Sequence, residues 1–493
     1  MGKPNILFVM FDQMAALSLP VYGHPIVRMP NLEALARRGT VFENAYCNAP
    51  LCSPARFAMM TGRLPAAIGA YDNAAELPSD QPTWAHRLRA QGYRTCLSGK
   101  MDFTGADQLH GYEERLTTDL SPSDFGWVPN WDRPDQVQNW YHTMASVAEA
   151  GPCDYTLNMQ YDEDACFKAI QWLHRRSGEQ DERPFALTVS FMHPHDPYQA
   201  PRAFWDWYEG KAIDAPDDNG QPIASRDLFG QRMYRLYDRG EIPVDAAQTL
   251  RARRAYYGML SYCDALLGRL LDRLDLLGLT DDTLVVVTSD HGDMLGERGL
   301  WYKMVFFERA IRVPLVFAGP GIAARRVPDP ISHVDLMPTL TGLAEGDGRS
   351  LFRLLNGDAD NRREVVGQYM GEGYDHPLIM LRRENWKFIH SAADGSFLYD
   401  LATDPMERRN VAESDLGRAL RDEVVQRWNL AALREAVLAS QRRRRLIHGA
   451  LTQGRIAAWD FEPPENAAQS YWRNYGDARP DPDRALRLPR AVP

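Results

Sequence analysis

The sequence predicts an α/β fold: a large, mixed but mostly parallel sheet flanked by helices, followed by a small antiparallel sheet toward the C-terminus. Two observations carry this prediction. Up to about residue 345, apolar runs alternate with helical stretches, which is typical of a parallel sheet covered by helices on both faces. Beyond that point, short strands follow one another with only polar turns between them, as in an antiparallel sheet.

Apolar runs and helical periodicity place the elements of the larger part. Strands are expected at residues 6–11, 95–98, 185–192 and 283–289, where apolar residues run together. Helices are expected at residues 31–38 and 82–91, because Gly39 and Gly92 stand where glycine commonly ends a helix. A longer helix is expected at about residues 244–277, where apolar residues recur at intervals of three and four.

The C-terminal part contains short strands at residues 378–382, 386–390 and 397–399, and then a helix at about residues 416–448. The tail beyond the helix, with the aromatic run 471–475, either wraps its own domain or contacts a neighbouring subunit. These patterns divide the 493 residues into a large α/β domain (1–345), a small antiparallel subdomain (346–415) and a C-terminal helix with its tail (416–493).

Composition excludes several classes of function. The net charge of −10 argues against a general nucleic-acid binder, and the basic block at residues 442–445 lies on a predicted helix, where a solvated or subunit-contacting face explains it. No apolar stretch is long enough for a signal segment or a membrane span. The six cysteines show no disulfide-framework spacing and are expected to be reduced. We therefore expect a cytoplasmic protein without membrane or nucleic-acid partners.

One short motif carries the chemistry. Cys52-Ser53-Pro54-Ala55-Arg56, followed by Thr61-Gly62-Arg63, has the pattern Cys-x-Pro-x-Arg. By itself it could mark a helix start with Pro54 in the first turn. The motif resembles the signature of the type I sulfatases, in which a formylglycine-generating enzyme oxidises this cysteine to formylglycine. This resemblance implies covalent catalysis: one hydroxyl of the aldehyde hydrate attacks sulfur, and the other then loses its proton and expels sulfate.

Two polar pairs follow predicted strands and indicate a metal site. Asp12-Gln13 and Asp290-His291 each stand at the carboxyl end of a strand, where parallel sheets place their ligands. Each aspartate alone could be a helix cap. Many sulfatases carry Asp-Asp and Asp-Asn here, a set suited to calcium. The amide and imidazole of this chain shift the preference toward manganese, with calcium and magnesium as alternatives.

A sulfate ester needs fixed positive charge around its oxygens. Arg56 lies one helical turn after Cys52, while Lys100 and Lys303 follow a strand and a loop. His195 follows another strand and is a candidate proton donor to the leaving oxygen. Each residue alone is more often a surface cation or a structural histidine, so the prediction depends on their common position beside Cys52.

Further stretches resemble the choline sulfatases in particular, over most of the chain and including its tail. They are residues 11–14, 44–48, 69–76, 107–111, 113–119, 124–127 and 290–304. The resemblance implies an alkaline-phosphatase-like fold, a homo-oligomer (dimer or tetramer) and a small cationic sulfate ester, choline-O-sulfate first. A quaternary ammonium needs an aromatic face and a carboxylate, and Trp127 and Glu372 match the family's substrate region.

Asp102 departs from the family pattern. Choline sulfatases have Lys-x-His after Ser-Gly, and the histidine contacts the nucleophile and the sulfate; this chain has Lys100-Met101-Asp102. A carboxylate about 5 Å from a sulfate is repelled by about 3 kcal/mol at an effective dielectric of about 20. Asp102 is therefore expected to be protonated, paired with Lys100 or Lys303, turned away, or active as the base that breaks down the hemiacetal.

Two other functions compete with sulfate-ester hydrolysis. Phosphonate monoester and phosphodiester hydrolases resemble this chain in formylglycine, fold and the Asp-Gln/Asp-His metal set. A non-catalytic anion-binding relative is suggested by Asp102 alone, and the presence of Cys52, Arg56, Lys100 and Lys303 argues against it.

Overall fold

The computed structural model describes residues 3–120, 124–217, 227–237, 241–358 and 364–454. The aromatic run at residues 471–475 lies outside these ranges. Within them, a nine-stranded sheet has the order β11-β2-β10-β8-β1-β6-β3-β4, with β9 also pairing with β2. The strands are β1 (Asn5–Phe11), β2 (Thr40–Tyr46), β3 (Arg94–Gly99), β4 (Glu114–Arg115), β6 (Phe185–Phe191), β8 (Thr283–Ser289), β9 (Arg312–Val313), β10 (Leu315–Ala318) and β11 (Arg325–Ser332).

Parallel pairing dominates the centre of this sheet. The strand β1 pairs in parallel with both β6 and β8, and β3 pairs in parallel with β6. The short β10 runs antiparallel to β8 and to β2, which makes the sheet mixed. The predicted fold class, with all four predicted strands of the larger part, is confirmed.

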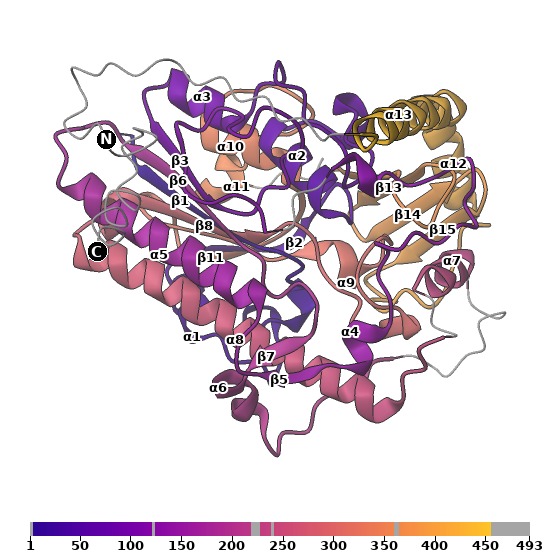
Figure 1. Cartoon of the computed structure of the whole chain (residues 1–493), viewed down its shortest axis with the longest axis horizontal. Helices are drawn as coiled ribbons and strands as arrows, with labels where there is room; N and C mark the ends of the chain where they lie inside the picture. The colour runs from indigo at the N-terminus through magenta and orange to yellow at the C-terminus, as the bar shows by residue number, and fades with distance from the viewer. Residues whose placement is uncertain (1–2, 121–123, 218–226, 238–240, 359–363, 455–493) are drawn as a thin grey trace. The chain divides into compact units, whose positions relative to one another are not determined.

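Helices cover both faces of the sheet, as Figure 1 shows. On one face lie α1 (Pro30–Arg37), α5 (Leu157–Ser177) and α8 (Ala246–Leu276), and on the other α2 (Cys52–Thr61), α3 (Trp84–Ala90) and α10 (Leu336–Thr341). A capping box at Asp245 and Gln248 fixes the start of α8. In the described ranges, no helix combines the length and the apolar character needed to cross a bilayer.

The register of the central strands creates one polar edge. Phe11 is level with Phe191 of β6 and with Ser289 of β8, so these three strands end together. The ladder continues for one more residue, because the Asp12 N–H donates to the Phe191 carbonyl and the Asp290 N–H to the Phe11 carbonyl. The predicted meeting of Asp12 and Asp290 at one edge of the sheet is thereby confirmed.

A four-stranded antiparallel sheet follows, in the order β12-β13-β14-β15. The three predicted strands are present as β13 (Leu378–Arg383), β14 (Trp386–Ser391) and β15 (Gly395–Asp400), and the sequence prediction missed β12 (Glu364–Tyr369). Helix α12 (Asp415–Arg427) packs on β14 and β15. The proposed boundaries at residues 345 and 415 stay a prediction.

The single helix predicted at residues 416–448 is wrong, because two helices occupy this stretch. The helix α12 ends before Trp428, whose backbone is extended, and α13 (Leu430–Leu451) begins after Asn429. The Asn429 side chain accepts a hydrogen bond from the Ala432 N–H at 3.0 Å. Asparagine is among the strongest helix N-caps, so it starts a new helix here instead of continuing the old one.

A buried ion cluster joins the small sheet to the large one. Lys387 of β14 has a fully buried side chain that contacts Glu308 at 3.0 Å and also Glu407. Glu308 begins α9 (Glu308–Ile311), which precedes β9 of the large sheet. Removing one member of such a cluster leaves an uncompensated buried charge.

We therefore predict that Lys387→Met lowers the free energy of unfolding by about 3–5 kcal/mol, measured by denaturant unfolding. The matched control is Lys168→Met, which removes a partly exposed pair with Asp164. That loss should stay below about 1 kcal/mol. Equal effects of the two substitutions would contradict a structural role for the cluster.

Candidate active site

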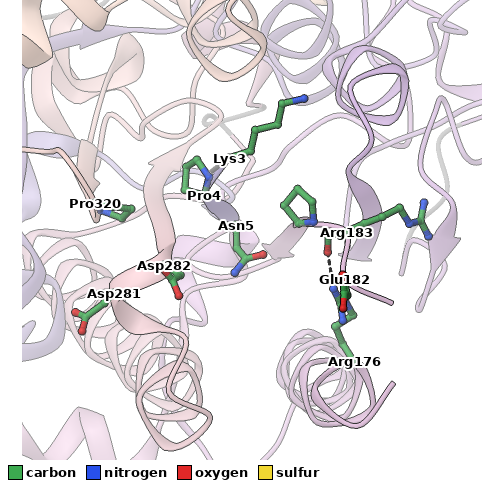
Figure 2. Close-up of a pocket in the computed structure, with 10 residues that line it drawn as sticks. Lys3, Pro4, Asn5, Arg176, Glu182, Arg183, Asp281, Asp282 and Pro320 are labelled. Atoms are coloured by element: carbon green, nitrogen blue, oxygen red, sulfur yellow. Dashed lines mark hydrogen bonds between the residues drawn. The ribbon is translucent and has the colours of Figure 1, made fainter. Parts of the chain in front are cut away.

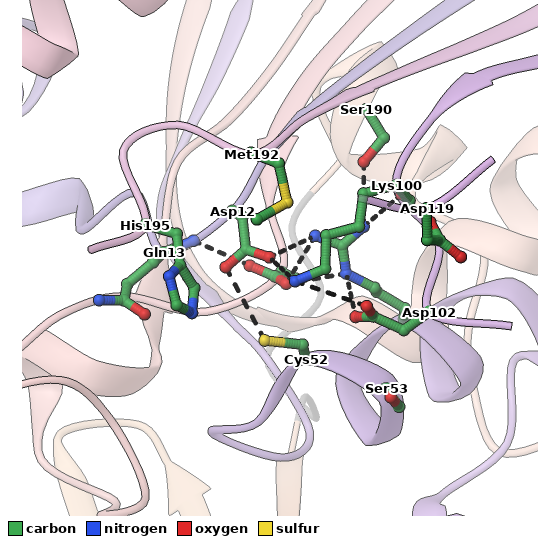
Figure 3. A network of polar contacts seen from close by, with 12 residues as sticks. Asp12, Gln13, Cys52, Ser53, Lys100, Asp102, Asp119, Ser190, Met192 and His195 are labelled. Carbon is green, nitrogen blue, oxygen red and sulfur yellow. Dashed lines mark hydrogen bonds and ion pairs between the residues drawn. The ribbon is translucent and has the colours of Figure 1, made fainter. Parts of the chain in front are cut away.

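Cys52 is the first residue of α2, a helix whose residues are all buried, and is itself only 2% exposed. Its Sγ lies 3.2 Å from His291 Nε2, 3.5 Å from Lys303 Nζ and 3.8 Å from Asp12 Oδ1. The structure thus brings the cysteine of the Cys-x-Pro-x-Arg motif to both predicted metal-binding pairs. Figure 3 shows its contact with Asp12.

Arg56 connects the site to the sheet. Its guanidinium is fully buried and donates to Asp290 Oδ2 at 2.9 Å and to Asp12 Oδ2 at 3.0 Å. It also donates to the Ser190 hydroxyl of β6 at 2.9 Å and to the Lys100 carbonyl. Since a buried charge is tolerated only when paired and hydrogen-bonded, these four acceptors explain how an arginine can lie in the core.

The two predicted metal-binding pairs come together around Cys52. One ligand atom from each of Asp12, Cys52, Asp290 and His291 lies within 4.8 Å of the others. Gln13 contacts this group through its backbone N–H, which donates to Asp290 Oδ1 at 3.0 Å, while its side-chain oxygen accepts from Lys303. Two buried carboxylates and one imidazole suit a hard or borderline divalent cation, so Asp12, Asp290 and His291 fit the metal site that the sequence predicts.

The positive charges around Asp12 favour the ionised form of its carboxyl group. Burial works to raise the pKa of Asp12, but Lys100 and the other neighbouring cations hold that pKa well below its usual range. Lys100 Nζ lies 2.6 Å from Asp12 Oδ2 and is itself buried. Asp12 is therefore available as an anionic ligand at neutral pH.

Lys303 is a second buried lysine beside the cysteine. Its ammonium donates to Gln13 Oε1 at 2.7 Å and to His195 Nε2 at 2.8 Å, besides the contact with Cys52. His195 Nδ1 in turn donates to the Asp196 carbonyl at 2.7 Å. A ring that accepts at Nε2 and donates at Nδ1 is a neutral imidazole with its proton on Nδ1.

Asp102 takes one of the arrangements expected from the sequence. Its Oδ1 lies 3.5 Å from Lys100 Nζ and its Oδ2 lies 3.4 Å from Arg56 Nε. Burial raises the pKa of Asp102, while Lys100 and Arg56 act to lower it. The carboxylate is therefore paired with Lys100 rather than with Lys303, and it points toward the site rather than away from it.

Sequence reasoning missed Asp293, which orients the Gln13 side chain. Asp293 Oδ2 accepts from Gln13 Nε2 at 2.7 Å, so the amide oxygen of Gln13 faces Lys303 and the cysteine. Tyr198 also donates to this carboxylate, at 2.8 Å. The available signal was the position of Asp293, two residues after His291 in a run that follows a strand.

A second missed group lies around Asp196. His142 Nδ1 lies 3.5 Å from Asp196 Oδ2, and the His142 ring stacks on Tyr302 at 4.3 Å between centroids. Together with His195, these residues could also hold a metal ion. His142 comes from a long loop with no strand before it, so its position in the sequence carried no signal.

Glu372 is buried in the loop after β12. The Glu372 side chain is 4% exposed, and no described residue donates a hydrogen bond to Oε2. Burial raises the pKa of Glu372 to about 7, and Lys303 acts in the opposite direction. Trp127 stacks on Trp140 at 6.0 Å, and Trp140 packs edge-on against Tyr141 at 4.4 Å. Burial raises the pKa of Tyr141, and the Glu372 carboxylate adds to this rise, so Tyr141 lies within electrostatic range of Glu372.

The groove in Figure 2 is not part of this site. It is lined by residues such as Lys3, Asn5, Pro184 and Asp282, which stand at the amino ends of β1, β6 and β8. That edge is opposite to the one where Asp12 and Asp290 lie. In parallel sheets, ligands bind at the carboxyl ends of the strands.

Comparison with known proteins agrees with this geometry. The family model described as Sulfatase matches residues 4–346, which is more than half of the chain. The chain belongs to the sulfatase family. A second model, described as choline sulfatase enzyme C terminal, matches residues 435–480 of this sulfatase, and the C-terminal model of N-sulphoglucosamine sulphohydrolase matches residues 296–434.

Individual relatives and solved structures extend the comparison. The choline-sulfatase of Rhizobium meliloti (strain 1021) is 44% identical to this sulfatase over 494 aligned residues, which cover 96% of each chain. Arylsulfatase K of Gallus gallus is 29% identical and covers 83% of this chain and 79% of its own. The crystal structure of the phosphonate monoester hydrolase of Agrobacterium radiobacter is 26% identical, with a TM-score of 0.66 over 88% of this chain and 96% of that one.

We predict that Asp293→Asn weakens divalent-metal binding by about 10- to 100-fold. One carboxylate oxygen of Asp293 accepts from Gln13 and Tyr198 and the other accepts from the Leu295 and Tyr302 N–H groups, whereas an amide has only one acceptor oxygen for these four donors. The measurement is titration of the metal-free protein with Mn²⁺ by calorimetry. The control is Asp264→Asn, since Asp264 is a buried carboxylate with a pKa also raised to about 6 by burial, but it binds Asn31 and Leu32. Equal loss in both variants would mean that Asp293 acts only on stability.

Proposed function

We propose that this sulfatase hydrolyses choline-O-sulfate to choline and sulfate. The observation that carries the proposal is Glu372, a buried carboxylate with an unpaired oxygen among the described residues, electrostatically coupled to Lys303 of the cysteine site. A buried anion without a hydrogen-bond donor is costly unless a cationic ligand neutralises it. The similarity to the Rhizobium meliloti choline-sulfatase over nearly the whole chain supports the same substrate.

Cys52 is proposed to act as formylglycine, so the thiol of the structure marks the place of an aldehyde hydrate. Such a hydrate supplies an oxygen nucleophile and a second hydroxyl whose deprotonation releases sulfate. Asp12, Gln13, Asp290 and His291 would hold a divalent metal ion, with manganese, calcium and magnesium as candidates. A metal ion in such a site polarises the ester and stabilises negative charge on oxygen.

The protein's own cations are proposed to hold the sulfate group. Lys303 contacts Cys52 and Lys100 contacts Asp12 beside it, while Arg56 binds the carboxylates of Asp12 and Asp290. Donors fixed before the reaction stabilise the charge that develops on the ester oxygens. Because these groups are buried, their electrostatic effect is stronger than it is in water.

Protonation of the leaving alcohol is assigned to His195 together with Lys303. The two share a hydrogen bond in which the ammonium donates to Nε2. In this proposal the leaving oxygen takes a proton from the Lys303 ammonium, and the neutral amine that remains stays hydrogen-bonded to His195. The Asp196 carbonyl holds the ring in place through Nδ1.

Choline recognition is assigned to Glu372, with Trp127 as an aromatic contact. A quaternary ammonium has no N–H to donate, so it is bound by aromatic faces and by an ionised carboxylate. The row of rings from Trp127 through Trp140 to Tyr141 supplies aromatic surface on the approach to Glu372.

A phosphonate monoester or phosphodiester hydrolase is the alternative function, favoured by the 26% identical solved structure of that activity. The formylglycine-generating enzyme as maturation partner, a homo-oligomer (dimer or tetramer) and a cytoplasmic location stay predictions from the sequence.

Conversion of Cys52 is testable by mass spectrometry. In protein produced together with a formylglycine-generating enzyme, we expect the tryptic peptide with Cys52 to be about 18 Da lighter than the cysteine form, as a covalent hydrolase of this type requires. Cys52→Ser prepared in parallel is the control. An unmodified thiol under these conditions would favour the non-catalytic alternative.

The substrate assignment is testable through Glu372. Glu372→Gln should raise KM for choline-O-sulfate at least tenfold and leave KM for an uncharged arylsulfate nearly unchanged, because only choline carries a cation. A carboxyl with a pKa of about 7 is mostly protonated below that pH. KM for choline-O-sulfate should thus fall as the pH rises from about 6 to 8 in the native protein, and not in the variant. A phosphonate monoester hydrolysed faster than choline-O-sulfate would support the alternative function.

A further inference from the structure

Asp102 is a carboxylate inside a site that has to bind an anion. Its side chain is 4% exposed, and both of its oxygens face cations, at 3.5 Å from Lys100 and at 3.4 Å from Arg56. No described residue donates a hydrogen bond to Oδ2. An oxygen of the substrate held by Lys100 at hydrogen-bond distance would lie within about 6 Å of this carboxylate.

The backbone holds Asp102 in place. Its φ of 59° lies in the left-handed region, which is uncommon for residues other than glycine. The preceding Met101 N–H donates to Asp119 Oδ1 at 2.8 Å, and Asp119 is itself bound by Arg115. A strained residue persists only where its surroundings fix it, so the position of this carboxylate is set by the fold.

The cations around Cys52 are already matched by carboxylates before a metal or a substrate is added. Asp12, Asp102 and Asp290 lie against Arg56 and Lys100, and Lys303 and the further carboxylate Asp196 both contact His195. The positive charge that remains for the substrate would therefore come from a bound divalent metal ion. A sulfate monoester carries one negative charge at neutral pH, whereas the product, inorganic sulfate, carries two, as does a phosphate monoester for most of the neutral range.

We propose that Asp102 is a specificity-determining residue that makes the site accept monoanionic esters and reject dianions, which both weakens inhibition by the product sulfate and excludes phosphate monoesters. The inference rests on the proposed sulfate-ester hydrolysis but not on choline as the alcohol. Repulsion from Asp102 acts on each negative charge of the ligand, so a dianion loses about twice as much binding free energy as a monoanion. The two cationic partners of Asp102 favour its ionised form.

The test compares inorganic sulfate with methyl sulfate, which has the same tetrahedral group and one charge fewer. Asp102→Asn removes the charge, keeps the shape and suits the left-handed backbone, because asparagine tolerates positive φ. Inhibition constants are measured on the metal-loaded, converted enzyme with an arylsulfate as the reporter substrate, and dissociation constants by calorimetry. The variant should bind sulfate roughly 10- to 100-fold more tightly and methyl sulfate by a clearly smaller factor.

The control is Asp264→Asn, which removes a charge from a buried carboxylate that binds Asn31 and Leu32 instead of Lys100 or Arg56. Its sulfate affinity should change less than about twofold, since none of these partners belongs to the site around Cys52. If Asp102→Asn does not fold, Asp102→Ser supplies the neutral side chain.

Two results would overturn the proposal. An unchanged ratio of sulfate to methyl sulfate affinity in the Asp102 variant would mean that the carboxylate carries no charge in the working enzyme. A large fall in kcat with the same unchanged ratio would assign Asp102 to the breakdown of the hemiacetal. Calorimetry reads sulfate binding directly, so failure to hydrolyse choline-O-sulfate would remove the proposed substrate without deciding this test.

Discussion

The structure of the site depends on one buried interaction, the Arg56 guanidinium between Asp12 and Asp290. Two carboxylates at the end of adjacent parallel strands repel each other and are expensive to bury. Arg56 compensates both, and the same side chain reaches Ser190 of β6 and the Lys100 carbonyl after β3. One arginine on α2 thereby joins the ends of four strands and fixes the helix that begins with Cys52.

Parallel strand order supplies the rest of the framework. Because β1, β6 and β8 end at the same level, the residues that follow them emerge at one edge of the sheet. The loops that follow β3, β6 and β8 contain Asp102, His195 and Lys303, and they place these side chains at the same edge. A rigid sheet with functional groups on its loops allows one chain segment to change charge without disturbing the core.

Helix α13 forms a second set of buried polar contacts, near the loop that carries Glu372. Arg444 binds both oxygens of the buried Asp72, at 2.6 and 2.7 Å. Gln441 accepts from the Trp131 N–H at 2.9 Å, and the Trp131 indole donates to the Gly371 carbonyl at 3.0 Å. The basic block of the sequence therefore includes one buried arginine that binds Asp72 through both terminal nitrogens, rather than only a solvated or subunit-contacting face. These contacts fix the loop that carries the Glu372 carboxylate.

The sequence by itself determined the α/β class, four central strands of the large sheet, the motif at Cys52 and the meeting of the pairs Asp12-Gln13 and Asp290-His291 at one edge, because each of these signals is local: an apolar run, a short motif, or a polar pair at a strand end. It did not determine β12 or the break between α12 and α13, where a short strand and a single capping residue gave weak signals. Only the tertiary structure decided that Asp293 orients Gln13, that Asp102 pairs with Lys100, and that Arg444 binds Asp72 across 372 residues of chain. The physical reason is that these contacts join segments far apart in the sequence. The chemistry of the side chains shows which pairs could form, but only the folded chain determines which pairs do form.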